Sequence, residues 1–177
     1  YELVESYQMA DAEYAIVCMG GMAETAEVTC NYMRNEMGLK VGVVHVTSFR
    51  PFPGPELVDA LRNVKAFTVL ERLDIPLGQS NPLTTEIKAA FADALVGTPD
   101  YPRIHRMPIV YSGSAGLGSR DIRPGDIIAA VKQMHRLLYR DGLTLAQARE
   151  LIAALAAQTP EAAADIETMS SFLAAAT

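Results

Sequence analysis

The sequence predicts a layered α/β fold built on a parallel sheet. One observation is the apolar run Tyr14–Met19, which is followed directly by Gly20 and Gly21 and then by a helical pattern from Met22. The other is that the same rhythm of strand and helix recurs three more times along the chain. A strand that is apolar throughout is typical of a sheet covered by helices on both faces. Alternating strands and helices then indicate right-handed crossovers between parallel strands.

The first elements follow from the local spacing of apolar residues. Residues 1–7 place Glu between apolar and aromatic side chains, as in a strand at a sheet edge. After the strand at Tyr14–Met19, apolar residues recur every three or four positions from Met22, and Gly38 closes the predicted helix. Residues 40–46 predict the next buried strand.

The middle of the chain predicts a loop, a short helix, a strand and a longer helix. Residues 47–55 are too rich in proline for a helix or a central strand. The short helix that follows leads to a buried strand at 66–70 and then to an exposed loop at 71–80. Asn81 is the predicted N-cap of the longer helix, with Pro82 at its first position.

The last elements of the core are a strand and a helix. Residues 103–111 predict the strand, and the glycine-containing residues 112–119 predict a flexible loop after it. Pro124 opens the last core helix, which stops near Gly142.

The tail differs in kind from the rest of the chain. Residues 143–177 are rich in alanine and predict two short amphipathic helices. We therefore expect an α/β domain at 1–142 and an appended helical hairpin or linker at 143–177. Such a hairpin packs either on its own domain or against a neighbouring domain or subunit, and both options stay open.

Length and composition are those of one globular domain. The chain has 177 residues, of which 50% are hydrophobic and 20% charged, and its formal net charge is −6. That acidic balance argues against nucleic acid as a partner. No apolar run reaches the roughly 20 residues of a membrane span, and no signal-peptide pattern opens the chain, so we expect a cytoplasmic protein. Because the first residue is Tyr1, we also expect a domain cut from something longer.

The glycine-containing turns do not predict a phosphate site. Gly20 and Gly21 lie where a helix N-terminus could face an anion, but Glu24 would repel phosphate and no nucleotide-binding fingerprint is present. A tight turn and close packing explain these two glycines. The glycines at 113–118 lack the lysine of a P-loop, and a connection between strand and helix explains them as well.

The remaining polar residues form no recognisable catalytic or metal-binding set. Cys18 and Cys30 make no CxxC pair, and no histidines have the spacing of metal ligands. Glu71 and Asp74 follow the carboxyl end of a predicted strand, where open α/β sheets place ligands. The ordinary interpretation is a solvated loop in which they pair with Arg72. We therefore expect no catalytic, cofactor-binding or metal-ligating residue in this chain.

A family resemblance is carried by four segments in order. The segments are residues 11–20, residues 43–52 with Phe49-Arg50-Pro51-Phe52, residues 69–78 with Leu70-Glu71-Arg72, and residues 113–124 with Gly118-Ser119-Arg120-Asp121. Together they resemble core domain II of pyruvate:ferredoxin oxidoreductase and related 2-oxoacid:ferredoxin oxidoreductases. The resemblance implies a transketolase C-terminal-like fold, in which a five-stranded, mostly parallel sheet lies between helices. It also implies that the first strand, at residues 1–7, is antiparallel.

The resemblance implies a noncatalytic role in structure and interdomain contact. Enzymes of this family oxidatively decarboxylate pyruvate or another 2-oxoacid to an acyl-CoA and pass electrons to ferredoxin or flavodoxin. Thiamine diphosphate, iron–sulfur clusters and coenzyme A then belong to other domains or subunits, and the isolated domain is inactive. Arg50, Arg72 and Arg120 are candidates for contacts with those domains, unless they pair locally with acidic neighbours.

Two alternative functions and one departure from the family remain. The same fold occurs in transketolases and 2-oxoacid dehydrogenases, and the two glycine turns could also serve an independent small-anion binding module. The departure is Arg123, which stands where the family commonly has Ser or Thr before the proline of the last core helix. The cap of that helix must then come from Asp121, Asp126 or water.

Overall fold

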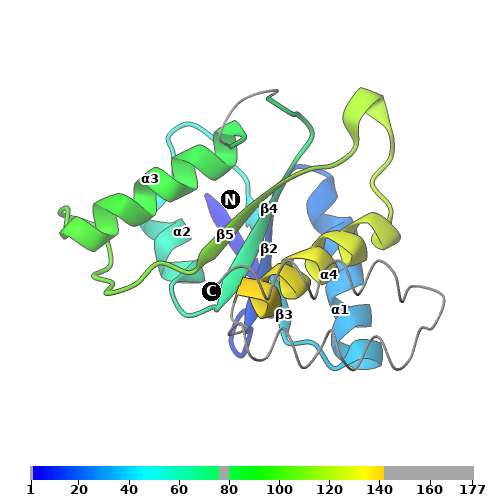
Figure 1. Cartoon of the computed structure of the whole chain (residues 1–177). Coiled ribbons are helices and arrows are strands. Elements are labelled where there is room, and N and C mark those ends of the chain that lie inside the picture. Colours follow the sequence, from blue (N-terminus) through cyan, green and yellow to red (C-terminus); the bar gives the residue numbers. More distant parts are fainter. Residues whose placement is uncertain (1, 76–79, 142–177) are drawn as a thin grey trace, which may run out of the picture. The chain divides into compact units, whose positions relative to one another are not determined.

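The computed structural model describes residues 2–75 and 80–141. Within them, five strands form one sheet in the order β1-β3-β2-β4-β5 (Figure 1). The strands are β1 (Val4–Tyr7), β2 (Tyr14–Met19), β3 (Val41–Val46), β4 (Ala66–Glu71) and β5 (Ile109–Ser114). β1 runs antiparallel to β3, and every other neighbouring pair is parallel. The predicted fold class, with its antiparallel first strand, is confirmed.

Helices cover both faces of the sheet (Figure 1). They are α1 (Met22–Met37), α2 (Gly54–Leu61), α3 (Pro82–Val96) and α4 (Pro124–Asp141), with a short 3-10 turn, η1 (Leu117–Ser119), before α4. α2 and α3 lie on one face, while α1 and the first part of α4 lie on the other. By its internal contacts the chain divides into Tyr1–Met134 and His135–Thr177, and the core described here belongs to the first unit.

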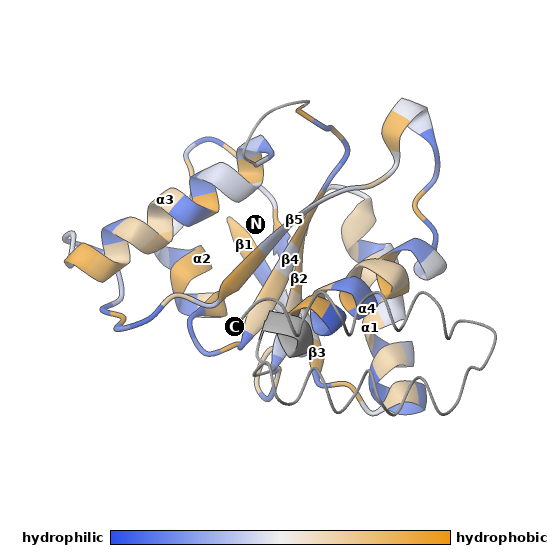
Figure 2. Cartoon of the chain, viewed as in Figure 1, coloured by the Kyte–Doolittle hydropathy of each residue, from blue (hydrophilic) through white to orange (hydrophobic). Residues whose placement is uncertain are grey.

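The core on the α2 and α3 side consists of alternate residues of the central strands. Ala15, Val17, Phe67 and Val69 are fully buried in the cluster that includes the apolar faces of both helices. Phe67 stacks on Phe91 of α3 with 5.8 Å between ring centroids. Because strand side chains alternate, the intervening residues of β2 and β4 point to the opposite face, toward α1 and α4. Figure 2 shows the apolar character of these central strands between helices of mixed hydropathy.

The predicted start and end of the first core helix are confirmed. α1 begins at Met22, directly after the turn at Gly20 and Gly21. It ends at Met37, and the C-cap residue Gly38 has a φ of 65°, in the left-handed region that favours glycine. A left-handed residue at this position supplies hydrogen-bond donors to carbonyls of the last turn, which have no partner inside the helix. The Gly38 N–H donates to the Met33 carbonyl.

The last strand was predicted at the wrong position. It was expected at 103–111 with a loop from 112, whereas β5 runs from Ile109 to Ser114. Pro108 has no N–H to donate to a sheet ladder, so the strand begins only after it. Gly113 pairs with Leu70 in the ladder between β4 and β5. A Cβ at this position would lie 2.9 Å from the Leu70 side chain, which explains the glycine.

The other predicted elements agree with the structure to within a few residues. The tail prediction at 143–177 lies outside the described residues, so the domain boundary at 142 stays a prediction. In the described ranges, no helix is both long and apolar enough to cross a bilayer.

Candidate functional site

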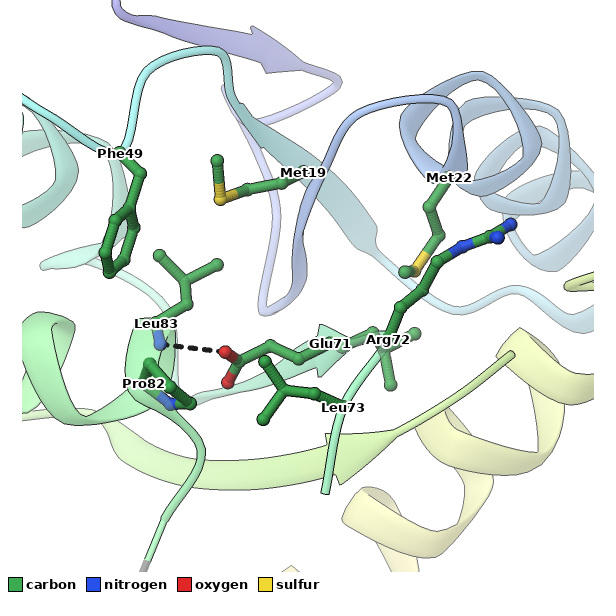
Figure 3. Close-up of a pocket in the computed structure, with 9 residues that line it drawn as sticks. Met19, Met22, Phe49, Glu71, Arg72, Leu73, Pro82 and Leu83 are labelled. Carbon is green, nitrogen blue, oxygen red and sulfur yellow. Dashed lines mark hydrogen bonds between the residues drawn. The ribbon is translucent and has the colours of Figure 1, made fainter. Parts of the chain in front are cut away.

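A concave region lies at the carboxyl ends of β2 and β4. These strands are neighbours, but β2 leads into α1 on one face of the sheet and β4 leads toward α3 on the other. Diverging connections leave a crevice at the point where open α/β sheets commonly bind ligands. A cavity of about 410 Å³ lies there. Its lining, shown in Figure 3, consists of Met19, Met22, Phe49, Leu70, Glu71, Arg72, Leu73, Pro82 and Leu83.

The lining of this cavity is almost entirely apolar. Only Glu71 and Arg72 among its residues carry a charge. Leu73, on the segment after β4, is 39% exposed, and Ile75 two residues later is 44% exposed. The cavity therefore opens beside a segment that presents apolar side chains to water.

Glu71 caps the N-terminus of α3 from the end of the neighbouring strand. Its side chain is buried, with the residue 7% exposed. Oε1 accepts the Leu83 N–H at 2.8 Å (Figure 3), while Oε2 accepts the Thr84 N–H at 3.2 Å and the Thr84 hydroxyl at 2.9 Å. The carboxylate satisfies N–H groups that have no partner inside the helix, at the end where the helix dipole favours negative charge. The interpretation of Glu71 as part of a solvated loop is wrong.

Asn81 occupies the N-cap position of α3 as predicted, but its side chain does not cap the helix. Instead, Nδ2 donates to the Leu73 carbonyl at 3.0 Å and to the Ser114 hydroxyl at 3.1 Å. Oδ1 accepts the Ile75 N–H at 3.3 Å. Because Glu71 already serves the helix N–H groups, Asn81 is free to hold the segment after β4 against the end of β5.

Two serines of β5 complete this polar network. The Ser112 hydroxyl accepts from the Asn81 N–H at 3.3 Å, and it lies 3.1 Å from the Thr84 hydroxyl, to which it can donate while Thr84 donates to Glu71. The Ser114 hydroxyl donates to Asp74 at 3.1 Å. Both serines were expected in a loop, so their part in this network was not predicted. Pro108 was the available signal, since a strand that starts after it places positions 110, 112 and 114 on one face.

The network holds the sheet edge in place and uses both oxygens of Glu71 as acceptors for α3. A role as a general base is disfavoured, because a proton taken up by this carboxylate would weaken the helix cap. The arrangement is suited to building a rigid floor under the cavity.

The three arginines named in the sequence analysis lie in different surroundings. Arg50 Nη2 is 2.6 Å from Glu86 Oε1, and its guanidinium lies 4.4 Å from the centre of the Phe49 ring. Arg50 therefore pairs locally. Arg72 and Arg120 are exposed and form no hydrogen bond or ion pair in the described part of the chain. Arg72 lines the apolar cavity, and Arg120 lines a second cavity of about 400 Å³ beyond the end of β5.

Backbone angle and available space show why glycines stand in the two turns. Gly20 has a φ of 66°, so the tight turn into α1 requires it. Close packing, the other explanation offered, is wrong for Gly20 and Gly21, because a Cβ on either would have no neighbour within 4 Å. Gly116 combines a φ of 70° with a close approach to Ile122.

The cap of α4 is one of the expected candidates. Asp126 Oδ2 accepts the Arg123 N–H at 2.9 Å. The Arg123 carbonyl in turn accepts the Asp126 N–H at 3.0 Å. A carboxylate in the first turn thus reaches back to the N-cap backbone, which is half of a capping box.

The two cysteines are poor metal ligands where they stand. Both are buried and free, and burial raises the pKa of Cys18 to about 12. Burial also raises the pKa of Cys30, whose thiol donates to the Val41 carbonyl at 3.1 Å. Metals and iron–sulfur clusters bind thiolates, and clusters generally require four of them, so these thiols do not fit such a group. Among the described residues, no group of three or more His, Cys, Asp or Glu side chains could hold a metal ion.

The chain matches one family model over most of its described core. The model is that of pyruvate:ferredoxin oxidoreductase core domain II, and it matches residues 12–127. A second model, described as domain 2 of Udp N-acetylglucosamine O-acyltransferase, matches residues 114–177.

Curated relatives share about one third of the aligned residues with this chain. Pyruvate synthase subunit PorA of Thermotoga maritima is 34% identical over 127 residues, which are 72% of this chain and 29% of the relative. Pyruvate-flavodoxin oxidoreductase of Klebsiella pneumoniae is 32% identical over 149 residues, which are 82% of this chain and 12% of the relative. Ketoisovalerate oxidoreductase subunit VorA of Pyrococcus furiosus is 31% identical over 137 residues, which are 77% of this chain and 32% of the relative.

A solved structure shares the fold. It is a 2-oxoglutarate:ferredoxin oxidoreductase from Magnetococcus marinus, determined with 2-oxoglutarate, coenzyme A and succinyl-CoA bound. The similarity has a TM-score of 0.53 at 20% identity and covers 75% of this chain and 20% of that chain. The chain thus spans only a minor part of the length of these proteins.

Proposed function

We propose a function from one premise: the chain belongs to the family of pyruvate:ferredoxin oxidoreductase core domain II, whose model its residues 12–127 match. We infer that it is a noncatalytic domain for structure and interdomain contact within a 2-oxoacid:ferredoxin oxidoreductase. The observation that carries this proposal is the length of the match, which includes the strands β2 to β5 and the start of α4. The polar network around Glu71 supports it, because those groups stabilise the fold.

The whole assembly, in this proposal, oxidatively decarboxylates pyruvate or another 2-oxoacid to an acyl-CoA. Its electrons pass to ferredoxin or flavodoxin. The names of the relatives support this class of reaction, since they include a pyruvate synthase subunit, a pyruvate-flavodoxin oxidoreductase and a ketoisovalerate oxidoreductase subunit. The assembly works in the cytoplasm.

The cofactors of that reaction belong to other parts of the assembly. Thiamine diphosphate stabilises the carbanion formed on decarboxylation, iron–sulfur clusters carry single electrons, and coenzyme A accepts the acyl group. The chain itself has two cysteines, both buried, and they do not suit a cluster. No step of the reaction is therefore assigned to residues of this chain.

The contacts with those other parts involve exposed arginines. Arg72 and Arg120 have no partner in the described ranges, which leaves both guanidinium groups available to carboxylates elsewhere in the assembly. Arg50 already pairs with Glu86, so we assign it a weaker contact role. The domain occupies 1–142, with 143–177 as an appended segment.

The test is the complete reading frame that contains this chain, expressed with any partner subunits. We expect reduction of ferredoxin or flavodoxin that depends on a 2-oxoacid, on coenzyme A and on thiamine diphosphate. We also expect cluster-binding cysteines in the flanking sequence. A frame with thiamine-binding segments but no such cysteines, and no ferredoxin reduction, would instead support a transketolase or 2-oxoacid dehydrogenase.

A further inference from the structure

We propose that the apolar cavity between the ends of β2 and β4 is a docking site for another part of the same oxidoreductase. We name it the β2–β4 crevice and define it by the nine lining residues given above. Its occupant is a large apolar side chain, next to a carboxylate that pairs with Arg72. This inference rests on the proposed function, because it supposes an assembly that extends beyond this chain.

The crevice is a built feature of the fold. Met19 reaches it from the end of β2, and Leu83 reaches it from the first turn of α3 (Figure 3). Leu70 of β4 also lines it. Glu71 fixes the start of α3 through the Leu83 N–H, so the floor and one wall are held together. Sites of about 300–1,000 Å³ hold drug-sized groups, so about 410 Å³ has room for a large side chain and part of its neighbour.

The surface beside the crevice is apolar as well. Leu73 is 39% exposed, and Ile75, two residues later on the same segment, is 44% exposed. Asn81 holds this segment in place through the Leu73 carbonyl and the Ile75 N–H. Exposed apolar side chains that are fixed beside an apolar hollow are typical of an interaction surface.

The charges at the crevice select an anionic partner. Glu71 is buried and already accepts three hydrogen bonds from α3, so its negative charge faces the N-terminus of that helix. Arg72 lines the crevice, is exposed, and has no partner in the described residues. A guanidinium pairs best with a carboxylate, which it can bind through two parallel hydrogen bonds.

A protein segment fits the crevice better than a free small molecule. A small-molecule site needs polar groups that converge inside the cavity. The lining of this crevice is apolar apart from Glu71, which caps α3, and Arg72, which follows β4. The chain spans 12% to 32% of the length of its curated relatives, so most of such a protein lies outside it. Interdomain interfaces combine apolar contacts with polar ones in this way.

The experiment places a photo-crosslinking amino acid at Leu73 in the complete oxidoreductase. The matched control carries it at Val28, which is 66% exposed on α1 and lies outside the crevice lining. We expect Leu73 to crosslink to one peptide outside residues 1–177, with an apolar residue beside an Asp or Glu, and Val28 not to crosslink to it. Arg72→Glu should lower the yield about tenfold, and replacing the partner's acid with Lys should restore it.

Three results would overturn the inference. These are crosslinks confined to residues 1–177, a yield unaffected by Arg72→Glu, or a Leu73 adduct to a small molecule in place of a peptide. The failure of the proposed function is measured separately, as the absence of 2-oxoacid-dependent ferredoxin reduction by the unmodified protein. If that activity is present and the Leu73 crosslink is absent, the docking inference alone is wrong.

Discussion

The carboxylate of Glu71 holds the backbone of Leu83, with 2.8 Å between Oε1 and the amide nitrogen. The last residue of a strand therefore caps the helix that begins eleven residues later. This cap ties β4 and α3 together at the floor of the β2–β4 crevice. It also releases Asn81, at the conventional cap position, to fix the exposed segment at residues 73–75.

Replacing Glu71 should destabilise the fold. Glu71→Ala leaves two backbone N–H groups and the Thr84 hydroxyl without their acceptor, and we expect a loss of about 2–3 kcal/mol in the free energy of unfolding. Glu71→Gln keeps one acceptor oxygen and should lose less. Urea denaturation monitored by circular dichroism measures both. Glu36→Gln on the exposed end of α1 is the control and should stay within about 0.5 kcal/mol of wild type. If Glu71→Ala matched that control, the cap would have no energetic role.

Removing the Asn81 side chain should loosen one segment more than the whole domain. Asn81→Ala loses the bonds to the Leu73 carbonyl, the Ile75 N–H and the Ser114 hydroxyl. We expect a global loss of about 1–2 kcal/mol and a faster hydrogen exchange at Ile75 than this loss explains. Exchange measured by NMR separates the two effects. Equal acceleration across β4 and the Ile75 amide would show that Asn81 stabilises only the domain as a whole.

The sequence predicted the sheet well because its strands are defined by short-range pattern. Tyr14–Met19 is apolar at every position, and the structure assigns it as β2 without change. The cap by Glu71 was beyond such reasoning, because nothing local indicates that the end of β4 lies beside the start of α3. The misplaced last strand is a different failure. Pro108 marked its true start, but the strand was predicted to run through the proline.

The pair between Asp11 and Arg34 should make stability depend on acidity. Arg34 Nη2 is 2.7 Å from Asp11 Oδ1, and this hydrogen bond lowers the pKa of the Asp11 carboxyl. Because the pKa is lower in the folded state, the stabilisation is present above the unfolded pKa and is lost as the pH falls through the folded pKa. Thermal unfolding should therefore show Asp11→Asn less stable than wild type at pH 7, with the difference vanishing on acidification. A difference that is constant with pH would contradict this linkage.

The turn after β2 separates two roles that glycine can have. Gly20 has a φ of 66°, while Gly21 has a φ of −60°. A side chain has open space at both positions. Gly20→Ala should therefore cost about 1–2 kcal/mol through backbone strain alone. Gly21→Ala, its matched control, should change stability by no more than about 0.5 kcal/mol, because its backbone already suits any residue. Chemical denaturation of the two variants decides the matter. Similar losses at both positions would mean that the turn is packed against something outside the described residues, whereas a loss at Gly20 alone assigns the glycine to the geometry of the turn.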